Sequence, residues 1–166
     1  MLRKQADWIA ATPLSKYLQD HLWIVPASQS IHIVCVAFVF GSAAMISLRL
    51  LGIGRSGRRV SQLVRTLVPW MYGGLAVLLL TGTVQTIAEP VRQFVTPEFW
   101  WKMFMIVWAL LLTMWFSHAV RKHAAIWDAP ESRPGAGRAF AVITLGLWLG
   151  IIACGRLIGY TWLFYV

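Results

Sequence analysis

Four apolar blocks, each close to the length that a helix needs to cross a bilayer, constrain this chain more than any other feature. They cover residues 30–51, 70–88, 99–120 and 139–164. A helix rises about 1.5 Å per residue and the hydrocarbon core is about 30 Å thick, so about 20 apolar residues cross it. Because the chain has 166 residues, little remains for a soluble domain. The sequence therefore predicts one all-α integral-membrane unit.

The charged residues support the same class and predict an orientation. They make up 13% of the chain, and its net charge is +9, whereas soluble domains carry about 25% charged residues. Nine of the fifteen Lys and Arg residues lie at or in the two loops that follow the first and third blocks. Basic residues in short loops beside spans are topology signals rather than a nucleic-acid surface. These loops are therefore predicted to be cytoplasmic, with both termini in the periplasm of a bacterial inner membrane.

Short connections predict how the blocks are arranged. Residues 30–166 should form an up-down-up-down four-helix bundle, because short loops make successive helices antiparallel neighbours. Pro69 is predicted to open the second span, and the loop before the fourth span is predicted to be irregular because it is rich in Pro and Gly. The bundle is expected to bind the lipid bilayer and other membrane or periplasmic subunits.

The leader, residues 1–29, is predicted to contain an amphipathic helix in the outer membrane interface. Thr12 and Pro13 resemble an N-cap followed by proline at the first helical position. An apolar stripe then recurs at helical spacing, through Leu14, Tyr17, Leu18 and Leu22. Pro26 is expected to end this helix.

Polar residues inside the spans predict which faces point inward, because a charge at the bilayer centre costs about 2.5–3.5 kcal/mol. One face of the first span carries His32, Cys35, Ser42 and Arg49, and one face of the third carries Lys102, Met105, Ala109, Thr113 and Ser117. Arg156 lies about 12 Å deep on the fourth span, and it is expected to point inward. For Lys102 two interpretations stay open, a snorkelling lysine and a buried one. The two cysteines are expected to be inert.

Most of these polar residues map to the outer half of the predicted bundle. His32 and His118 lie on opposite sides of the membrane, which excludes them as joint ligands of one haem. A turn at Pro26 would instead fold His21 over His32, and two imidazoles are ligands that haem b or a metal uses. The candidate cofactor-binding residues are His32, His21, Lys102, Arg156, Tyr160 and Glu89, with His32 and His21 as the candidate metal ligands.

Three functions remain open for this outer cluster. The first is a subunit of a membrane redox system, serving as an anchor or in electron transfer, with haem b or a quinone as its cofactor and with Lys102 and Arg156 neutralising acidic groups. The second is a cofactor-free scaffold or assembly factor, in which the cluster is structural. The third is a small oligomeric transporter. No motif of hydrolytic catalysis occurs, so the sequence assigns no catalytic residue.

Several phrases together resemble a bacterial family of small four-helix inner-membrane proteins known only as a domain of unknown function. They are "IHIVCVAFVFGSAAMISLRLLG", "LVPWMYGGLAVLLLTGTVQ", "FWWKMFMI" and "LWLGIIACGRLIGY". The resemblance runs from about Ser30 to Tyr160. Its recurring features fall on His32, Gly41-Ser42, Arg49 to Gly52, Pro69-Trp70, Gly82, Lys102, His118, Gly155-Arg156 and Tyr160. Ser47 departs from the family pattern, which has an acidic residue there. The resemblance implies a fold and no activity.

Overall fold

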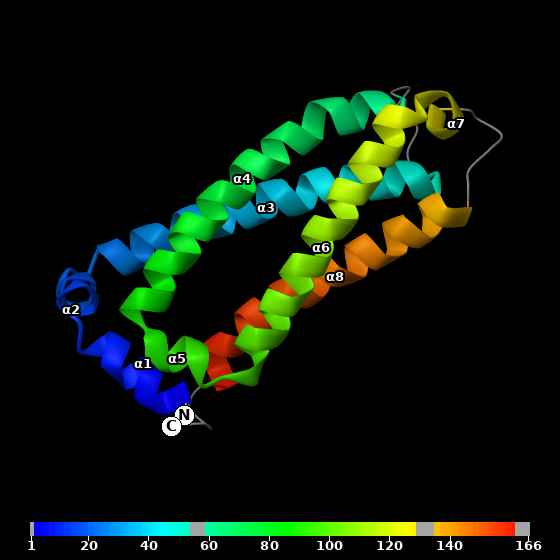
Figure 1. Ribbon diagram of the computed structural model, residues 1–166. Coiled ribbons are helices and arrows are strands. Elements are labelled where there is room, and N and C mark those ends of the chain that lie inside the picture. Colours follow the sequence, from blue (N-terminus) through cyan, green and yellow to red (C-terminus); the bar gives the residue numbers. More distant parts are fainter. Residues whose placement is uncertain (1, 54–58, 129–134, 162–166) are drawn as a thin grey trace.

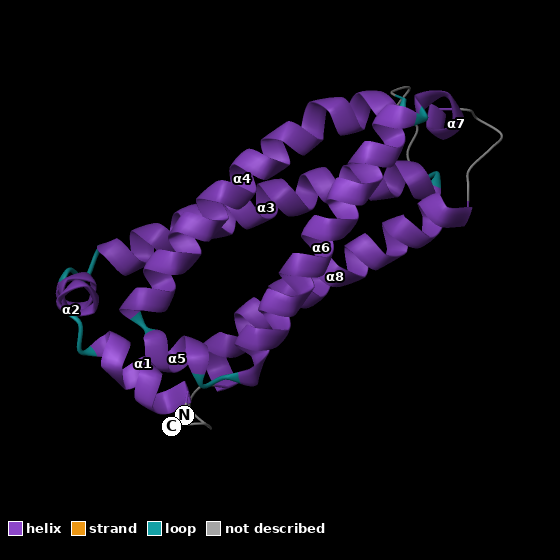
Figure 2. Cartoon of the chain, viewed as in Figure 1, coloured by secondary structure: helices purple, strands orange, loops and turns teal. Residues whose placement is uncertain are grey.

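The computed structural model describes residues 2–53, 59–128 and 135–161, and every regular element within them is a helix (Figures 1 and 2). Four helices are long: α3 (Ile24–Leu51), α4 (Val60–Ala88), α6 (Pro97–Lys122) and α8 (Gly135–Thr161). Four are short: α1 (Leu2–Ala10), α2 (Pro13–Asp20), α5 (Pro90–Phe94) and α7 (Ala124–Asp128). The short helices lie at the two ends of the long ones, α1, α2 and α5 at one end and α7 at the other (Figure 1).

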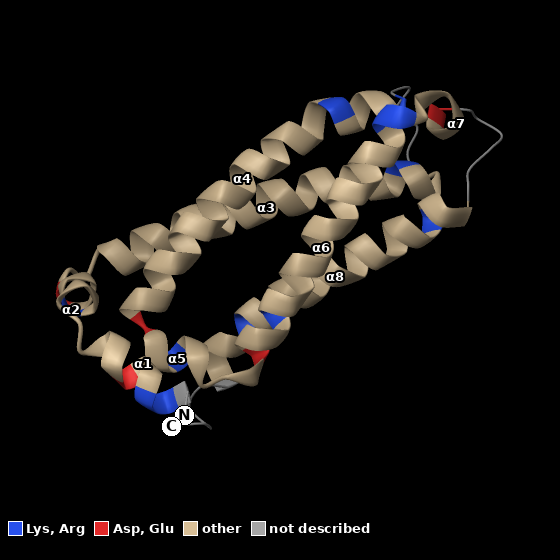
Figure 3. Ribbon diagram, in the orientation of Figure 1, with Lys and Arg blue, Asp and Glu red and all other residues tan. Residues whose placement is uncertain are grey.

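The four long helices confirm the number of predicted spans, since each is long and apolar enough to cross a membrane. Charged residues are confined to their end portions, and α3 and α4 are uncharged through their middles (Figure 3). Two predicted boundaries are wrong. α3 begins at Ile24, so Pro26 lies in its first turn, where a missing N–H breaks no helical hydrogen bond. α4 begins at Val60, so Pro69 lies inside a helix that it was predicted to open.

The long helices pack as two pairs joined along one seam. α3 packs most extensively on α4 and α6 on α8, while α3 and α8 join the pairs. Gly74 allows the close approach of α4 to α3, because a Cβ atom there would lie 2.7 Å from Cγ2 of Val39. Gly150 has the same role between α8 and α6, where a Cβ atom would lie 2.8 Å from the sulfur of Met105. Small residues bring helix backbones together in this way in membranes.

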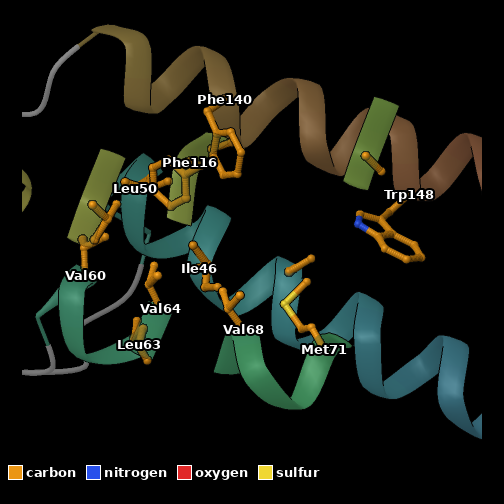
Figure 4. Packing of buried hydrophobic residues seen from close by; sticks show 14 of the residues in the cluster. Ile46, Leu50, Val60, Leu63, Val64, Val68, Met71, Phe116, Phe140 and Trp148 are labelled. Carbon is orange, nitrogen blue, oxygen red and sulfur yellow. The ribbon is translucent and has the colours of Figure 1, made fainter. Parts of the chain in front are cut away.

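The continuous hydrophobic core fills only the half of the molecule nearest α7. Its fully buried members lie within residues 39–50, 60–71, 109–120 and 140–151. Phe116 and Phe140 stack there with ring centroids 3.9 Å apart (Figure 4). Trp127 of α7 packs on Phe116 in an edge-to-face arrangement. Toward the α5 end, the inward-facing His32, Thr81 and Lys102 remain partly exposed. The polar residues of interest therefore lie beyond the limit of the tightly packed core.

The leader docks on α4 through polar groups. Thr12 is the predicted N-cap, and its hydroxyl accepts from the amide of Ser15 at 3.4 Å. The Ser15 hydroxyl donates to the Ile87 carbonyl at 2.7 Å, and the Gln19 amide donates to the Ala88 carbonyl at 2.9 Å. These carbonyls lie in the last turn of α4, where a helix has no internal donors for them.

The apolar stripe predicted for the leader is mostly not packed against the chain. Leu18 is buried, while Leu14, Tyr17 and Leu22 are exposed. The helix also ends at Asp20 rather than at Pro26. The docking of α2 thus depends on Ser15, Gln19 and Leu18, and its remaining apolar side chains are free to contact lipid, as the predicted interfacial placement requires.

The start of α4 is capped from a distance as well. The Asp128 carboxylate, at the end of α7, accepts from the backbone amide of Ser61 at 3.0 Å and from its hydroxyl at 2.6 Å. A carboxylate at a helix N-terminus satisfies orphan amides and interacts favourably with the helix dipole. α7 lies in the loop that was predicted to be irregular, so that prediction is wrong for residues 124–128. Residues 129–134 of that loop lie outside the described part.

Replacing Asp128 by Ala should destabilise the protein by about 1–2 kcal/mol, because the start of α4 loses its acceptor. Thermal unfolding in detergent micelles measures this effect. Asp7→Ala, at an exposed position of α1, is the control and should leave the midpoint unchanged. Equal midpoints for the two variants would show that Asp128 does not cap α4.

Candidate functional site

His32 is held against α4 by a directed hydrogen bond. Its Nδ1 atom lies 2.8 Å from Oγ1 of Thr81. The Thr81 hydroxyl also lies 2.8 Å from the carbonyl of Val77, one turn earlier, and donates its single proton there. On this basis we assign Thr81 as the acceptor and place the imidazole proton on Nδ1. In the neutral ring, Nε2 then presents a lone pair, and it has no hydrogen-bond partner in the described part of the chain.

The His32 ring lies beside Gly82 of α4, and a second bond from α3 reaches the same turn. A Cβ atom at Gly82 would lie 3.5 Å from Cε1 of the ring, an ordinary van der Waals distance. One turn before His32, the Ser28 hydroxyl donates to the Thr81 carbonyl at 3.3 Å. Both contacts of α3 with Thr81 fix the rotation of the two helices, and they confirm that the predicted His32 face of α3 points inward.

Lys102 reaches the same region from α6. Its ammonium lies 5.2 Å from the centroid of the Phe99 ring, a cation–π contact one turn nearer the helix start. Its electrostatic neighbours are His32 on α3 and Cys154 on α8. Within residues 2–53, 59–128 and 135–161 it forms no salt bridge. Both interpretations of Lys102, snorkelling and buried, therefore hold in part. The side chain is partly exposed and turned toward the start of α6, as a snorkelling lysine would be, yet its ammonium lies over the buried ring of Phe99.

All four long helices contribute to the candidate polar site: His32 bonds Thr81, and Lys102 lies within electrostatic range of His32 and Cys154. The prediction of an inward Lys102 face is confirmed farther along α6, where Ala109, Thr113 and Ser117 are buried. Sequence reasoning missed Cys154, which it interpreted as an inert thiol. Only the packing of α8 on α6 places this residue. Gly150, one turn before Cys154, lies against Met105 of α6, so Cys154 lies on the same side of α8.

Two of the predicted members are engaged elsewhere. Nδ1 of His21 lies 2.9 Å from the carbonyl of Tyr17, and its ring packs on the Tyr17 ring with centroids 4.2 Å apart. No contact between His21 and His32 is present among the described residues. Glu89 forms a salt bridge of 2.6 Å with Arg92, a residue that the sequence analysis did not single out.

Arg156 and Tyr160 do not point inward, which corrects the prediction for the α8 face. Arg156 is exposed, and so is Tyr160 at the next turn. The buried side of this helix passes through Trp148, Ile151 and Ile158, and position 156 lies about 160° around the helix from position 158. Large side chains that pack against α3 and α6 set the rotation of α8, so the arginine faces outward.

The other two histidines lie outside the polar site, and the described residues offer no metal-binding group. His118 and His123 are exposed near the end of α6. In the parts of the chain that the structure describes, no group of three or more His, Cys, Asp and Glu side chains is placed to hold a metal ion. A haem with one or two histidine ligands is a different case, because it does not require such a group.

Comparison with known proteins assigns the chain to a family. Residues 10–161 match the model of a family of unknown function (DUF6644). The chain belongs to this family, which agrees with the resemblance seen in its sequence. No curated protein and no solved structure matches the chain significantly.

The His32–Thr81 bond predicts a measurable coupling. Thr81→Val keeps the side-chain shape and removes the acceptor, which should cost about 1–3 kcal/mol because the imidazole N–H loses its partner. In a His32→Phe background the same change should cost much less. Thermal unfolding of the single and double variants gives the coupling energy. Thr83→Val, at an exposed threonine on the same helix, is the matched control, and additive effects of His32→Phe and Thr81→Val would disprove the bond.

Proposed function

We propose that the protein is a multi-pass protein of the bacterial inner membrane, arranged up-down-up-down with both termini in the periplasm. Four long apolar helices support the membrane placement. The orientation rests on the distribution of basic residues, nine at or in the predicted cytoplasmic loops and six on the opposite side. In this orientation the site around His32 and Lys102 lies in the outer half of the membrane.

Reporter fusions test this orientation. Alkaline phosphatase, which folds only in the periplasm, should be inactive when fused at Arg59 or at Gly135 and active when fused after Val166. The reason is the excess of basic residues on the side of the first two fusion points. A β-galactosidase fusion at each point should give the opposite pattern, and a reversed result with both reporters would invert the topology.

We further propose that the polar site binds the headgroup of a lipid-soluble ligand of the quinone class. One observation carries this proposal: His32 and Lys102, on different helix pairs, lie close enough to interact electrostatically within otherwise apolar spans. The ammonium donates hydrogen bonds, and Nε2 of His32 accepts one. A quinone carbonyl matches the donor, and a quinol hydroxyl matches the acceptor. Neither group is neutralised by a carboxylate in the described part of the chain, so a polar ligand from the bilayer would compensate their desolvation.

Haem b is the second candidate ligand. The Nδ1 atoms of His32 and His21 each have an oxygen partner, an arrangement that leaves Nε2 for iron, as at other histidine-ligated sites. Lys102 would then neutralise a propionate. The quinone proposal is preferred because it needs only residues that lie together, whereas a bis-histidine haem also needs His21, which the described contacts do not join to the site.

With a ligand of either kind, the protein would be a subunit of a membrane redox system. It would act as an anchor or as an electron carrier, together with other membrane or periplasmic subunits. The alternative is a cofactor-free scaffold. In that case the His32–Thr81 bond would serve only to hold α3 on α4.

Binding of a short-chain ubiquinone to the protein in lipid nanodiscs distinguishes these functions. Quenching of tryptophan fluorescence should saturate, and His32→Ala and Lys102→Met should each weaken binding at least tenfold, or about 1.4 kcal/mol. Arg156→Gln, on the outward face of α8, is the control and should bind as the unmodified protein does. Spectra of the oxidised and dithionite-reduced protein test for haem. Unsaturable quenching without a haem spectrum would favour the scaffold.

A further inference from the structure

Several buried polar atoms without partners lie beyond the His32 site, from the last turn of α4 to the α5 end of the molecule. Within the described residues, the Gln85 amide nitrogen, Nε of Arg92, the Gln93 amide oxygen and one Glu98 oxygen are inaccessible and form no hydrogen bond. Gln93 as a whole is more than nine-tenths buried. All four belong to one stretch of chain, residues 85–98, which runs from the last turn of α4 through α5 into α6.

The same stretch continues a polar line that begins at His32. Thr81 and Gln85 are four residues apart, so they share one face of α4 and lie about 6 Å apart along its axis; Glu89 follows directly after the end of the helix. This face turns toward α3, because Thr81 bonds His32 and Gly74 approaches Val39. The line ends at the Glu89–Arg92 salt bridge, which is partly exposed. These polar residues therefore run from His32 toward the surface at the α5 end.

The chemistry of the unpartnered atoms indicates which kind of molecule would satisfy them. Two are donors, on Gln85 and Arg92, and two are acceptors, on Gln93 and Glu98. Each buried polar atom without a partner costs about 1–3 kcal/mol. Water both donates and accepts, and buried waters in proteins satisfy groups of this kind. A single anion or cation would satisfy only half of them.

We propose that water molecules fill this line along α4 and connect His32 with the aqueous phase at the α5 end. The site then exchanges protons with one side of the membrane only, because the packed core of residues 39–50, 60–71, 109–120 and 140–151 closes the other side. The titratable and charged groups along this stretch and at the site are His32, Glu89, Arg92, Glu98 and Lys102, with Cys154 within electrostatic range of Lys102. This inference deepens the proposed function, since a quinone site needs such access, but it does not require any ligand to be bound.

Cysteine labelling tests the route directly. In a background with Cys35→Ser and Cys154→Ser, Gln85→Cys is treated with a charged, membrane-impermeant methanethiosulfonate in right-side-out vesicles. The reagent reacts with thiolates, which form where water is present. Thr83→Cys is the matched control, because it lies on the same turn of α4 but is exposed on the opposite face. Gln85→Cys should react at least tenfold faster than Thr83→Cys, and inverted vesicles should show no such difference.

A second pair of variants tests the end of the route at His32, and it also serves if Gln85→Cys does not fold. It compares His32→Cys with Val34→Cys, an outward-facing position on α3. His32→Cys should also be labelled faster from the α5 side. Equal rates within each pair, in variants that elute as the unmodified protein on gel filtration, would overturn the inference. Because no quinone is added, a failure here is distinct from a failure of quinone binding.

Discussion

The backbone groups at the two ends of α4 depend on side chains from distant parts of the chain, and much of the structure is arranged around that dependence. Ser15 and Gln19 donate to carbonyls of its last turn, and Asp128 accepts from an amide of its first. In an apolar environment such groups are costly unless they are paired. The short helices α2 and α7 therefore cap α4. They fix the position of α4, whose Thr81 forms the hydrogen bond with His32.

The candidate site lies where tight packing ends. Fully buried apolar side chains pack the half near α7, while the half near α5 has polar inward groups that remain partly exposed. Packing makes the first half rigid, and that rigid half carries the helices on which His32 and Lys102 lie. The proposed ligand and water would occupy the other half, where the inward groups are polar. The family to which the chain belongs carries no assigned activity, so these proposals rest on the residues themselves.

The faces of α6 and α8 show how much of the helix orientation could be predicted from the sequence. The polar stripe on α6 from Lys102 to Ser117 was predicted to point inward, and its members Ala109, Thr113 and Ser117 are buried. The same reasoning was wrong for Arg156, because it assumed that a charge within a span must face the interior. On α8 the bulk of Trp148, Ile151 and Ile158 fixes the rotation instead. Polarity predicts well which face of a helix points inward where the polar residues are small. Where the opposite face carries large apolar side chains, their packing decides the rotation of the helix.

The sequence by itself determined the four long apolar helices, the Thr12 cap of the leader helix and the place of His32 on an inward face. These features are local, because they follow from the length of an apolar run, from one capping residue and from helical periodicity. Only the tertiary structure decided that His32 bonds Thr81, that Lys102 and Cys154 join them, and that Asp128 caps α4. Those contacts link residues 49 to 67 positions apart or lie on different helix pairs. The rotation and spacing of packed helices set them, and no local pattern in the sequence encodes either quantity.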